Sequence, residues 1–367
     1  MKKATLTILI IAVLICVIGI LSIYSSNYQK EGEFWQSIYR RQILWACLGL
    51  CLFFAMANFN YRRLWDFTHI LYGAVVFLLL LVFILGAVRL GAQRWLRFAW
   101  FNFQPSEVAK LMIVIFMAKY YSEKSSGDVS LSVSRQGIMH ALLIPLFFVA
   151  VPAVLIVEQP DLGSGIMVMS VFAVIVFLAG VKLRYLFLLF ALTAACFPVF
   201  WNFLRGYQKD RLMVFLNPNI DPLGAGYTVI QSKIAIGSGS LFGKGWLLGT
   251  QSQLHFLPES HTDFIFATFA EESGLAGSII LLLLYYILIR QGISIGRKTA
   301  DSFGKLLAFG ISFMLGIQVC VNIAMNLGLA PVVGIPLPLM SYGGSSLMVT
   351  FISLGILANI AKERSVF

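Results

Sequence analysis

Residues 1–24 read MKKATLTILIIAVLICVIGILSIY, in which two lysines precede 21 uncharged and mostly apolar residues. A helix of roughly 20 apolar residues spans the hydrocarbon core of a membrane, so this run is long enough to cross one. It is longer than the apolar part of a typical secretory signal, and no A-x-A cleavage site follows it. The stretch therefore predicts a first transmembrane helix that stays in the mature chain.

Similar runs recur along the whole chain. Hydrophobic residues make up 59% of the 367 residues, charged residues make up only 12%, and the mean hydropathy is +0.87. This composition excludes an ordinary water-soluble globular protein and predicts one polytopic, all-α integral membrane domain over residues 1–367. We expect about ten transmembrane helices, at residues 4–24, 42–58, 68–88, 105–121, 139–157, 166–181, 186–204, 264–289, 306–326 and 346–361.

The basic residues indicate how these helices are oriented. If the chain starts inside and alternates, 15 of the 27 Lys and Arg residues fall on the cytoplasmic side and 12 on the outer side, five of the 12 in one long loop. Because cytoplasmic loops are enriched in Lys and Arg, this distribution predicts that both termini lie in the cytoplasm. The outer side is still unusually basic. That suits an anionic substrate at the outer leaflet, and contact with lipid headgroups is the alternative explanation.

Residues 205–263 form the long extracytoplasmic loop between the seventh and eighth expected helices. Within it, the segment 226–236 places Tyr227, Ile230 and Ile234 on one helical face. This spacing predicts a short helix that lies along the membrane surface.

Residues 331–346 form a second irregular outer segment, just before the last expected helix. Pro331, Pro336 and Pro338 exclude a regular helix over most of this segment. Irregular backbone at membrane depth is tolerated only where protein buries it or where it lines a wet cavity. We therefore expect this segment either to be buried in protein or to line a wet cavity on the outer side.

Asp263 ends the long loop, one residue before the apolar run 264–289. An ionisable group at the edge of the hydrocarbon is costly, so Asp263 is a candidate functional residue. The spacing from Ser260 to Asp263 also fits a capping box that opens an ordinary helix, and both interpretations stay open. Among basic groups, this carboxylate suits a general base that acts on a hydroxyl while cations hold a phosphorylated leaving group. A proton- or ion-coupled lipid transporter is the alternative use.

Glu107 and Lys110 lie three residues apart at the start of the fourth expected helix. An acidic residue in the first turn favours the helix dipole and attracts the Lys, which explains the pair without a function. Alternatively, the pair lines a cavity and binds a pyrophosphate. His255 and His261 lie near two carboxylates, but their spacing matches no strong metal-binding signature.

Several long motifs resemble those of the SEDS family, the shape, elongation, division and sporulation proteins. The resemblance covers nearly the whole chain. Within the family, the strings IQSKIAIGSG (230–239) and GTQSQ (249–253) resemble the elongation members more than the division or sporulation members. The other matching strings are GAQRW (91–95), QPSE (104–107), QPDLG (159–163), DPLGAGY (221–227), GKGW (243–246), FLPESHTDFIF (256–266) and PLPLMSYGGS (336–345).

The resemblance implies a peptidoglycan glycosyltransferase that polymerises the lipid-linked disaccharide precursor, lipid II, on the outer face of the bacterial plasma membrane. Asp263 falls on the family's catalytic aspartate. It would take the proton from the 4-hydroxyl of the acceptor sugar, whose oxygen displaces undecaprenyl pyrophosphate with inversion. Glu107 and Lys110 fall on a polar pair that lines the central cavity in the family, and we assign them to substrate positioning. Arg211 and Lys244 are our own additions, as substrate-binding neighbours of the pyrophosphate.

The resemblance also implies the partners. These are lipid II and the growing glycan strand, the elongation machinery, membrane lipids, and a class B penicillin-binding protein that crosslinks the glycan, with no nucleic acid. No cofactor is certain. A divalent cation, Mg²⁺ or Mn²⁺, suits a pyrophosphate leaving group, but no ligand set can be read from the sequence. Two other functions stay open. A flippase for the precursor would depend on Glu107 and Lys110 more than on Asp263, and a non-catalytic scaffold for a transpeptidase would depend on no single carboxylate.

Overall fold

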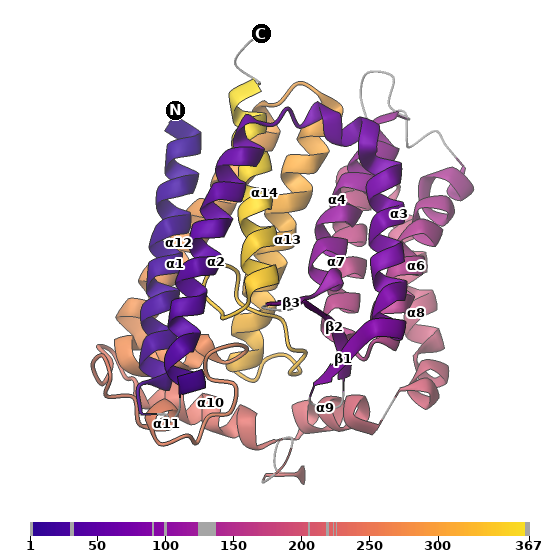
Figure 1. Cartoon of the computed structure of the whole chain (residues 1–367). Helices are drawn as coiled ribbons and strands as arrows, with labels where there is room; N and C mark the ends of the chain where they lie inside the picture. Colours follow the sequence, from indigo (N-terminus) through magenta and orange to yellow (C-terminus); the bar gives the residue numbers. More distant parts are fainter. Residues whose placement is uncertain are drawn as a thin grey trace.

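Each of the ten apolar runs contains a helix in the computed structural model (Figure 1), which describes residues 3–29, 33–89, 92–98, 101–123, 137–204, 206–217, 220–222, 224 and 226–363. The helices in these runs are α1 (Lys3–Asn27), α2 (Glu33–Asn58), α3 (Arg62–Leu85), α4 (Pro105–Glu123), the π-helix η1 (Met139–Leu143) followed by α6 (Ile144–Glu158), α7 (Leu162–Leu178), α8 (Leu183–Phe203), α12 (Ile265–Lys298), α13 (Ser302–Asn326) and α14 (Gly344–Glu363).

Seven helices within the described residues are long and apolar enough to cross a membrane: α1, α2 from Ser37, α3, η1 with α6, α12, α13 and α14. The helix α7 and residues 183–195 of α8 are apolar but shorter. The helix α4 has 19 residues and carries four charged side chains, Glu107, Lys110, Lys119 and Glu123. The all-α membrane class is therefore confirmed, whereas the number of crossings and their boundaries stay predictions.

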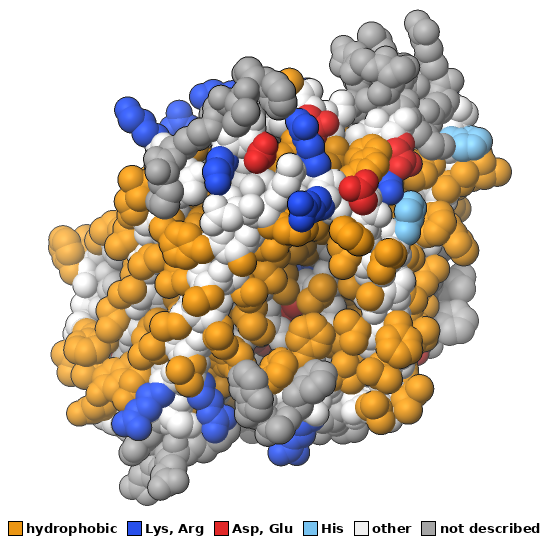
Figure 2. Space-filling model, turned by 45° about the horizontal axis from the view of Figure 1, so that its top comes forward, with side chains coloured by type: hydrophobic (Ala, Val, Ile, Leu, Met, Phe, Trp, Pro, Cys, Tyr) orange, Lys and Arg blue, Asp and Glu red, His pale blue; other side chains and the backbone are white. Residues whose placement is uncertain are grey.

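The helix α14 lies at the centre of the bundle. In its most apolar window 83% of the residues are buried, compared with 22% in α3 at the periphery. It packs along α2, while α12 packs against α13 and α1, and α4 packs against α3, α13 and α7. Figure 2 shows a belt of hydrophobic side chains between two ends where Lys and Arg side chains gather. A hydrophobic belt between two basic ends is the surface expected of a protein that contacts the hydrocarbon core of a membrane.

A small antiparallel sheet connects α3 to α4, which the sequence analysis did not anticipate. It consists of β1 (Gly86–Arg89), β2 (Ala92–Phe98) and β3 (Phe101–Phe103), in that order, with an irregularity between Ala87 and Val88. The side-chain amide of Gln93 donates a 2.9 Å hydrogen bond to the carbonyl of Gly86, where α3 ends. The sheet fixes the position of Arg94 and leads directly into the first turn of α4.

The helix α12 is broken at Gly274, although its sequence looked like one continuous run. Gly274 adopts φ 66° and ψ −164°, a conformation open essentially to glycine alone. The loop at 240–245 fills the break. Its Lys244 and Gly245 N–H groups donate to the carbonyls of Glu271 and Glu272, and its Ser240 and Leu241 carbonyls accept from the N–H groups of Leu275 and Ala276, all at 3.0–3.1 Å. A broken helix persists in a membrane protein because such contacts satisfy the freed backbone groups.

The long loop contains three helices, α9 (Gly206–Leu216), α10 (Tyr227–Ser238) and α11 (Thr250–Gln253), while Arg205 lies outside the described residues. The predicted helix near 226–236 is confirmed as α10, and its apolar face is not covered by the bundle along its whole length. Ile234 is 46% exposed, whereas Ser232 is fully buried. The reason is a 2.8 Å hydrogen bond from the Ser232 hydroxyl to the carbonyl of Asn326, which turns this polar residue toward the bundle.

Candidate active site

Asp263 lies in the turn between α11 and α12, and its side chain does not cap the helix. The turn closes through the N–H groups of Thr262 and Phe264, which donate to the carbonyl of Glu259. The N-cap residue of α12 is Phe264, without a side-chain cap. The Ser260 hydroxyl is buried without a hydrogen-bond partner. The capping-box interpretation is therefore wrong, and the Asp263 carboxylate is available for other chemistry.

Two asparagines at the end of α13 hold the backbone of Asp263. The side-chain amides of Asn322 and Asn326 each donate a 3.1 Å hydrogen bond to the Asp263 carbonyl. Asn322 also donates to the carbonyl of Ile335 at 2.8 Å, and the Asn326 side-chain oxygen accepts from the Ala267 N–H at 3.2 Å. Both asparagines are fully buried. They tie the turn, the start of α12 and the irregular segment after α13 into one unit.

Sequence reasoning missed this pair, although a signal was present. Asn322 and Asn326 are polar residues four positions apart in an otherwise apolar run. Uncharged polar groups inside a membrane bundle need partners, and two of them one turn apart on one helix indicate a shared target.

Substitution of Asn322 by alanine is expected to misplace Asp263. The change leaves two buried carbonyls with fewer donors, at a cost of about 1–3 kcal/mol per unsatisfied group. We expect a lower thermal unfolding temperature and a catalytic rate at Asp263 that falls further than the stability loss explains. Thr350→Ala serves as the matched control, because its hydroxyl bonds only to the Ser346 carbonyl within α14. Equal losses in the two variants would contradict this role for Asn322.

The segment between α13 and α14 packs directly beside the turn. The N–H of Tyr342 donates to the carbonyl of His261 at 3.0 Å, and the Ser341 hydroxyl donates to the carbonyl of Thr262 at 2.7 Å. Gly334 has φ +73°, and a Cβ built on it would lie 3.6 Å from an Asp263 carboxylate oxygen. The predicted irregular backbone is thus present at 327–343, and it forms one wall beside the carboxylate.

Burial raises the pKa of Asp263 to about 6, from an ordinary value of 3.8. The neighbouring Glu259 carboxylate adds to the rise, and Asp161 contributes a smaller part. Arg211 and Arg94 act in the opposite direction because their positive charges stabilise the carboxylate. Among the described residues, none donates a hydrogen bond to the side-chain oxygens of Asp263. A carboxyl with these properties can lose and regain a proton near neutral pH.

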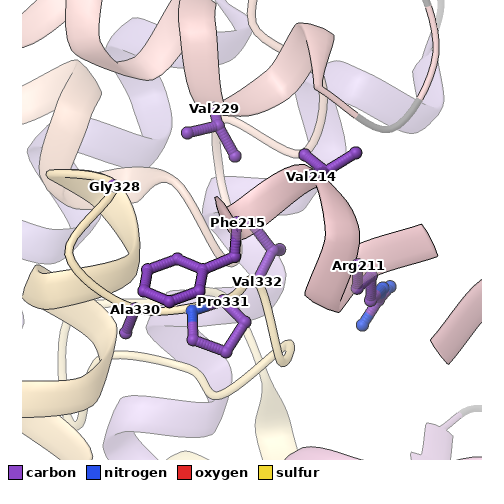
Figure 3. A pocket seen from close by; sticks show the side chains of 8 residues that line it. All are labelled: Arg211, Val214, Phe215, Val229, Gly328, Ala330, Pro331 and Val332. Carbon is purple, nitrogen blue, oxygen red and sulfur yellow. The ribbon is translucent and has the colours of Figure 1, made fainter. Parts of the chain in front are cut away.

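Arg211 extends from α9 on the far side of a small apolar pocket (Figure 3). The pocket has an open volume of about 10 Å³ and lies between α9, α10 and the segment after α13. Figure 3 shows the rings of Phe215 and Pro331 together on one side and Arg211 on the other. Of the predicted substrate-binding residues, Arg211 thus lies close enough to Asp263 for its charge to lower the pKa of that carboxyl.

Arg94 is a second cation near Asp263. No role was predicted for this residue from the sequence. It projects from β2, and one terminal nitrogen of its guanidinium donates to the carbonyl of Pro160. Its Nε is buried without a hydrogen-bond partner. Next to Pro160, Asp161 caps α7 by accepting from the Ser164 N–H, and it also accepts from Ser106 at 3.0 Å. These contacts connect the sheet, the start of α4 and the start of α7.

Glu107 and Lys110 form a buried ion pair within α4. Their charged atoms are 2.7 Å apart, and Glu107 and Lys110 are 2% and 1% exposed. The structure thus confirms their pairing. We expected the pair to line a cavity. In the described structure, however, both side chains are buried and reach no open cavity.

Lys244 is not brought to Asp263. Its ammonium pairs with the fully buried Glu271 at 2.7 Å and donates to the Thr250 hydroxyl at 2.8 Å. Glu271 also accepts from the N–H groups of Thr250 and Gln251. Lys244 therefore holds the long loop against the broken helix. The attraction between opposite charges explains its position without a substrate.

Among the described residues, no group of three or more His, Cys, Asp or Glu side chains could hold a metal ion. His261 instead contacts the rings of Trp35 and Tyr342, at 5.7 and 5.9 Å between centroids.

Comparisons with known proteins identify relatives of this chain. The FTSW_RODA_SPOVE family model, described as a cell cycle protein, matches residues 5–366. The peptidoglycan glycosyltransferase MrdB of Escherichia coli (strain K12) is 42% identical over 98% of this chain and 93% of its own length.

Two solved structures share the fold. A chain from a study of how a peptidoglycan synthase complex coordinates polymerization and crosslinking superposes with a TM-score of 0.81 and 30% identity, covering 97% of both chains. The rod shape determining protein RodA of Thermus thermophilus superposes with a TM-score of 0.71 and 28% identity, covering 97% of this chain and 96% of its own. A family model that matches nearly the whole chain, together with a relative that is 42% identical over 98% of it, places the chain in the family of FtsW, RodA and SpoVE, the SEDS proteins.

Proposed function

We propose that Asp263 is the general base of this protein, a peptidoglycan glycosyltransferase that polymerises lipid II into glycan strands during cell elongation. The observation that carries the proposal is the state of the Asp263 carboxyl. It has no hydrogen-bond donor among the described residues, its pKa is raised to about 6, and two arginines lie in its surroundings. The 42% identity with a peptidoglycan glycosyltransferase supports the same reaction for this chain.

The reaction assigns a role to each part of the site. Asp263 takes the proton of the acceptor 4-hydroxyl, and the oxygen forms a bond to the anomeric carbon of the donor sugar. The bond from that carbon to the pyrophosphate breaks on the opposite face, so the anomeric centre inverts. The proton stays on Asp263 until it passes to solvent, and undecaprenyl pyrophosphate departs.

Arg211 and Arg94 are placed to offset the charge that develops on the leaving group. Arginine binds phosphate oxygens through two parallel N–H bonds, and the Arg94 and Arg211 side chains are both only partly buried. We assign Glu107 and Lys110 to positioning, because their ion pair fixes the first turn of α4 beneath Ser106 and Asp161.

The pH dependence of polymerisation tests the assignment of the base. Only the deprotonated carboxylate accepts a proton, so kcat/KM is expected to rise about tenfold per pH unit up to about pH 6 and then to level off. Glu259→Gln is expected to move the midpoint down, because the Glu259 charge raises the pKa of Asp263. Arg211→Gln is expected to move it up, because the Arg211 charge lowers that pKa. Midpoints unchanged in both variants would exclude Asp263 as the titrating group.

The proposed function also concerns where the protein lies and which protein it works with. We propose that the protein lies in the bacterial plasma membrane with its termini in the cytoplasm and Asp263 on the outer face, as the distribution of Lys and Arg favours. We also propose a class B penicillin-binding protein as its partner. The similar chain from a synthase complex that coordinates polymerization and crosslinking supports such a pairing.

An assay with purified protein separates this function from its two rivals. The full chain in detergent, supplied with lipid II, is expected to produce glycan polymer, and a class B penicillin-binding protein is added in a parallel reaction. A flippase would form no polymer in either detergent reaction. After reconstitution into lipid vesicles, it would move lipid II across the vesicle membrane. A scaffold would give neither transport nor polymer, so absence of polymer in both reactions would overturn the proposal.

A further inference from the structure

The last turns of α12 carry an open hollow lined by both apolar and basic side chains. Its volume is about 500 Å³. Tyr286, Ile289 and Ile293 supply its apolar wall, and Ser294 adds a hydroxyl. The remaining lining residues are the three exposed cations Arg290, Arg297 and Lys298.

These three cations have no partner among the described residues, unlike several other basic groups at this end of the bundle. No hydrogen bond, ion pair or ring contact joins Arg290, Arg297 or Lys298 to another described residue. By contrast, the Arg63 guanidinium lies 5.7 Å from the Phe59 ring, and Arg184 lies 4.9 Å from the Tyr185 ring. The α12 cations therefore form an uncompensated positive cluster, which favours an anionic ligand.

The hollow lies at the end of the bundle opposite Asp263. Just beyond α12, Asp301 accepts a 3.1 Å hydrogen bond from the Tyr61 hydroxyl, and the N–H of Tyr61 donates to Asn359 near the end of α14. Figure 1 shows both chain termini at this end. The hollow is thus separate from the candidate active site and belongs to the other membrane leaflet.

The vertical order of the lining residues matches a phospholipid. Arg297 and Lys298 lie at the end of the helix, where headgroups lie, and Arg290 lies about 10 Å deeper at ~1.5 Å per residue. An Arg at that depth extends its head toward the phosphates while its stem covers apolar surface. Ile293 lies between Arg290 and Arg297, Ile289 lies level with Arg290, and Tyr286 lies about one turn deeper. These apolar side chains alternate with the cations on one helix face, beside the path of an acyl chain.

We propose that this face of α12 is a binding site for an anionic phospholipid. Its phosphodiester pairs with Arg290, Arg297 and Lys298, and an acyl chain lies against Tyr286, Ile289 and Ile293. Nothing in the reaction at Asp263 requires this site, so it stands or falls separately from the proposed function.

Native mass spectrometry of the full chain with added phosphatidylglycerol or phosphatidylcholine tests the site. The variant Arg290→Gln/Arg297→Gln/Lys298→Gln is compared with the control Arg63→Gln/Arg184→Gln/Lys305→Gln, which removes the same charge from exposed residues. One basic residue near an anionic lipid contributes roughly a factor of five in affinity. We expect the α12 variant to lose phosphatidylglycerol at least about tenfold and the control to change less than about twofold, with equal unfolding temperatures in lipid-free detergent.

Three outcomes would overturn the site. The first is equal retention of phosphatidylcholine and phosphatidylglycerol by the wild type, which would mean that no headgroup is recognised. The second is an equal loss in the control variant, which would mean that only overall surface charge matters. The third comes from a photo-crosslinking residue in place of Ile293 in membranes, if it captures another protein helix instead of lipid.

Discussion

Asp263→Asn is expected to lower the rate of glycan polymerisation by a factor of roughly 10²–10⁴ and to leave the fold intact or more stable. The rate factor is the usual contribution of a positioned general base. Asparagine has nearly the same shape as aspartate, and the hydrogen bonds of the Asp263 carbonyl to Asn322 and Asn326 involve only the backbone. The loss should therefore lie in the chemical step and not in the binding of lipid II.

The expected gain in stability follows from the raised pKa. Asp263 titrates at about 6 in the fold and near 3.8 in the unfolded chain, so the folded state holds the proton more tightly. The stability that this group contributes is fully present below pH 3.8 and is lost as the pH rises through 6. Asparagine stays neutral and keeps it, so at pH 8 the variant should be more stable by on the order of 1–3 kcal/mol. Thermal unfolding at pH 4 and pH 8 measures this difference.

Glu259→Gln is the matched control for this experiment. Glu259 belongs to the same turn, its side chain is exposed, and its carbonyl closes the turn onto Thr262 and Phe264. The substitution removes one carboxylate charge without touching that carbonyl. We expect near-normal polymerisation at pH 8, because Asp263 is fully deprotonated there in both proteins. A loss as large as that of Asp263→Asn would show that the turn needs negative charge in general and not a base at one position.

Glu107→Gln is expected to have the largest effect on stability. The change leaves the Lys110 ammonium buried without its counter-charge, and breaking a buried ion pair in this way costs about 3–5 kcal/mol. Glu123→Gln is the control on the same helix, because its pair with Lys119 is 3.6 Å apart and the Glu123 side chain is 45% exposed. Such exposed pairs contribute about 0–1 kcal/mol. Thermal unfolding of both variants in one detergent gives the comparison.

The double variant Glu107→Gln/Lys110→Met then separates structure from substrate contact. It removes both charges and keeps similar volumes, so much of the lost stability should return. If the pair only fixes the start of α4, polymerisation returns with stability. If the pair touches lipid II, the rate stays low in a stable protein, and our positioning assignment is wrong.

The sequence predicted the helices well because each helix that spans a membrane needs a long apolar run. It failed at Gly274, since a single glycine after two glutamates does not reveal that the distant loop at 240–245 enters the break. The sheet at 86–103 was missed for a similar reason. Its strands are short, and only the pairing of one with another makes them stable.

The candidate site was predictable in part. Asp263 was selected by its position at the end of a polar loop and by its family motif, and Arg211 was proposed as a neighbour of the pyrophosphate. Lys244 looked equally suitable in sequence, but only the fold shows that Glu271, on a helix beyond the loop, neutralises it. The sequence also does not show how exposed a side chain is. Glu107 and Lys110 were therefore expected beside an open cavity, but in the fold both are buried.

The most direct test of the central claim is the single-turnover rate of glycosidic bond formation at saturating lipid II and pH 8, measured for the wild type, Asp263→Asn and Glu259→Gln. Our account predicts that all three proteins bind lipid II alike. It also predicts that Glu259→Gln reacts at close to the wild-type rate and Asp263→Asn at least about a hundredfold more slowly. A wild-type rate in Asp263→Asn would show that another group removes the proton.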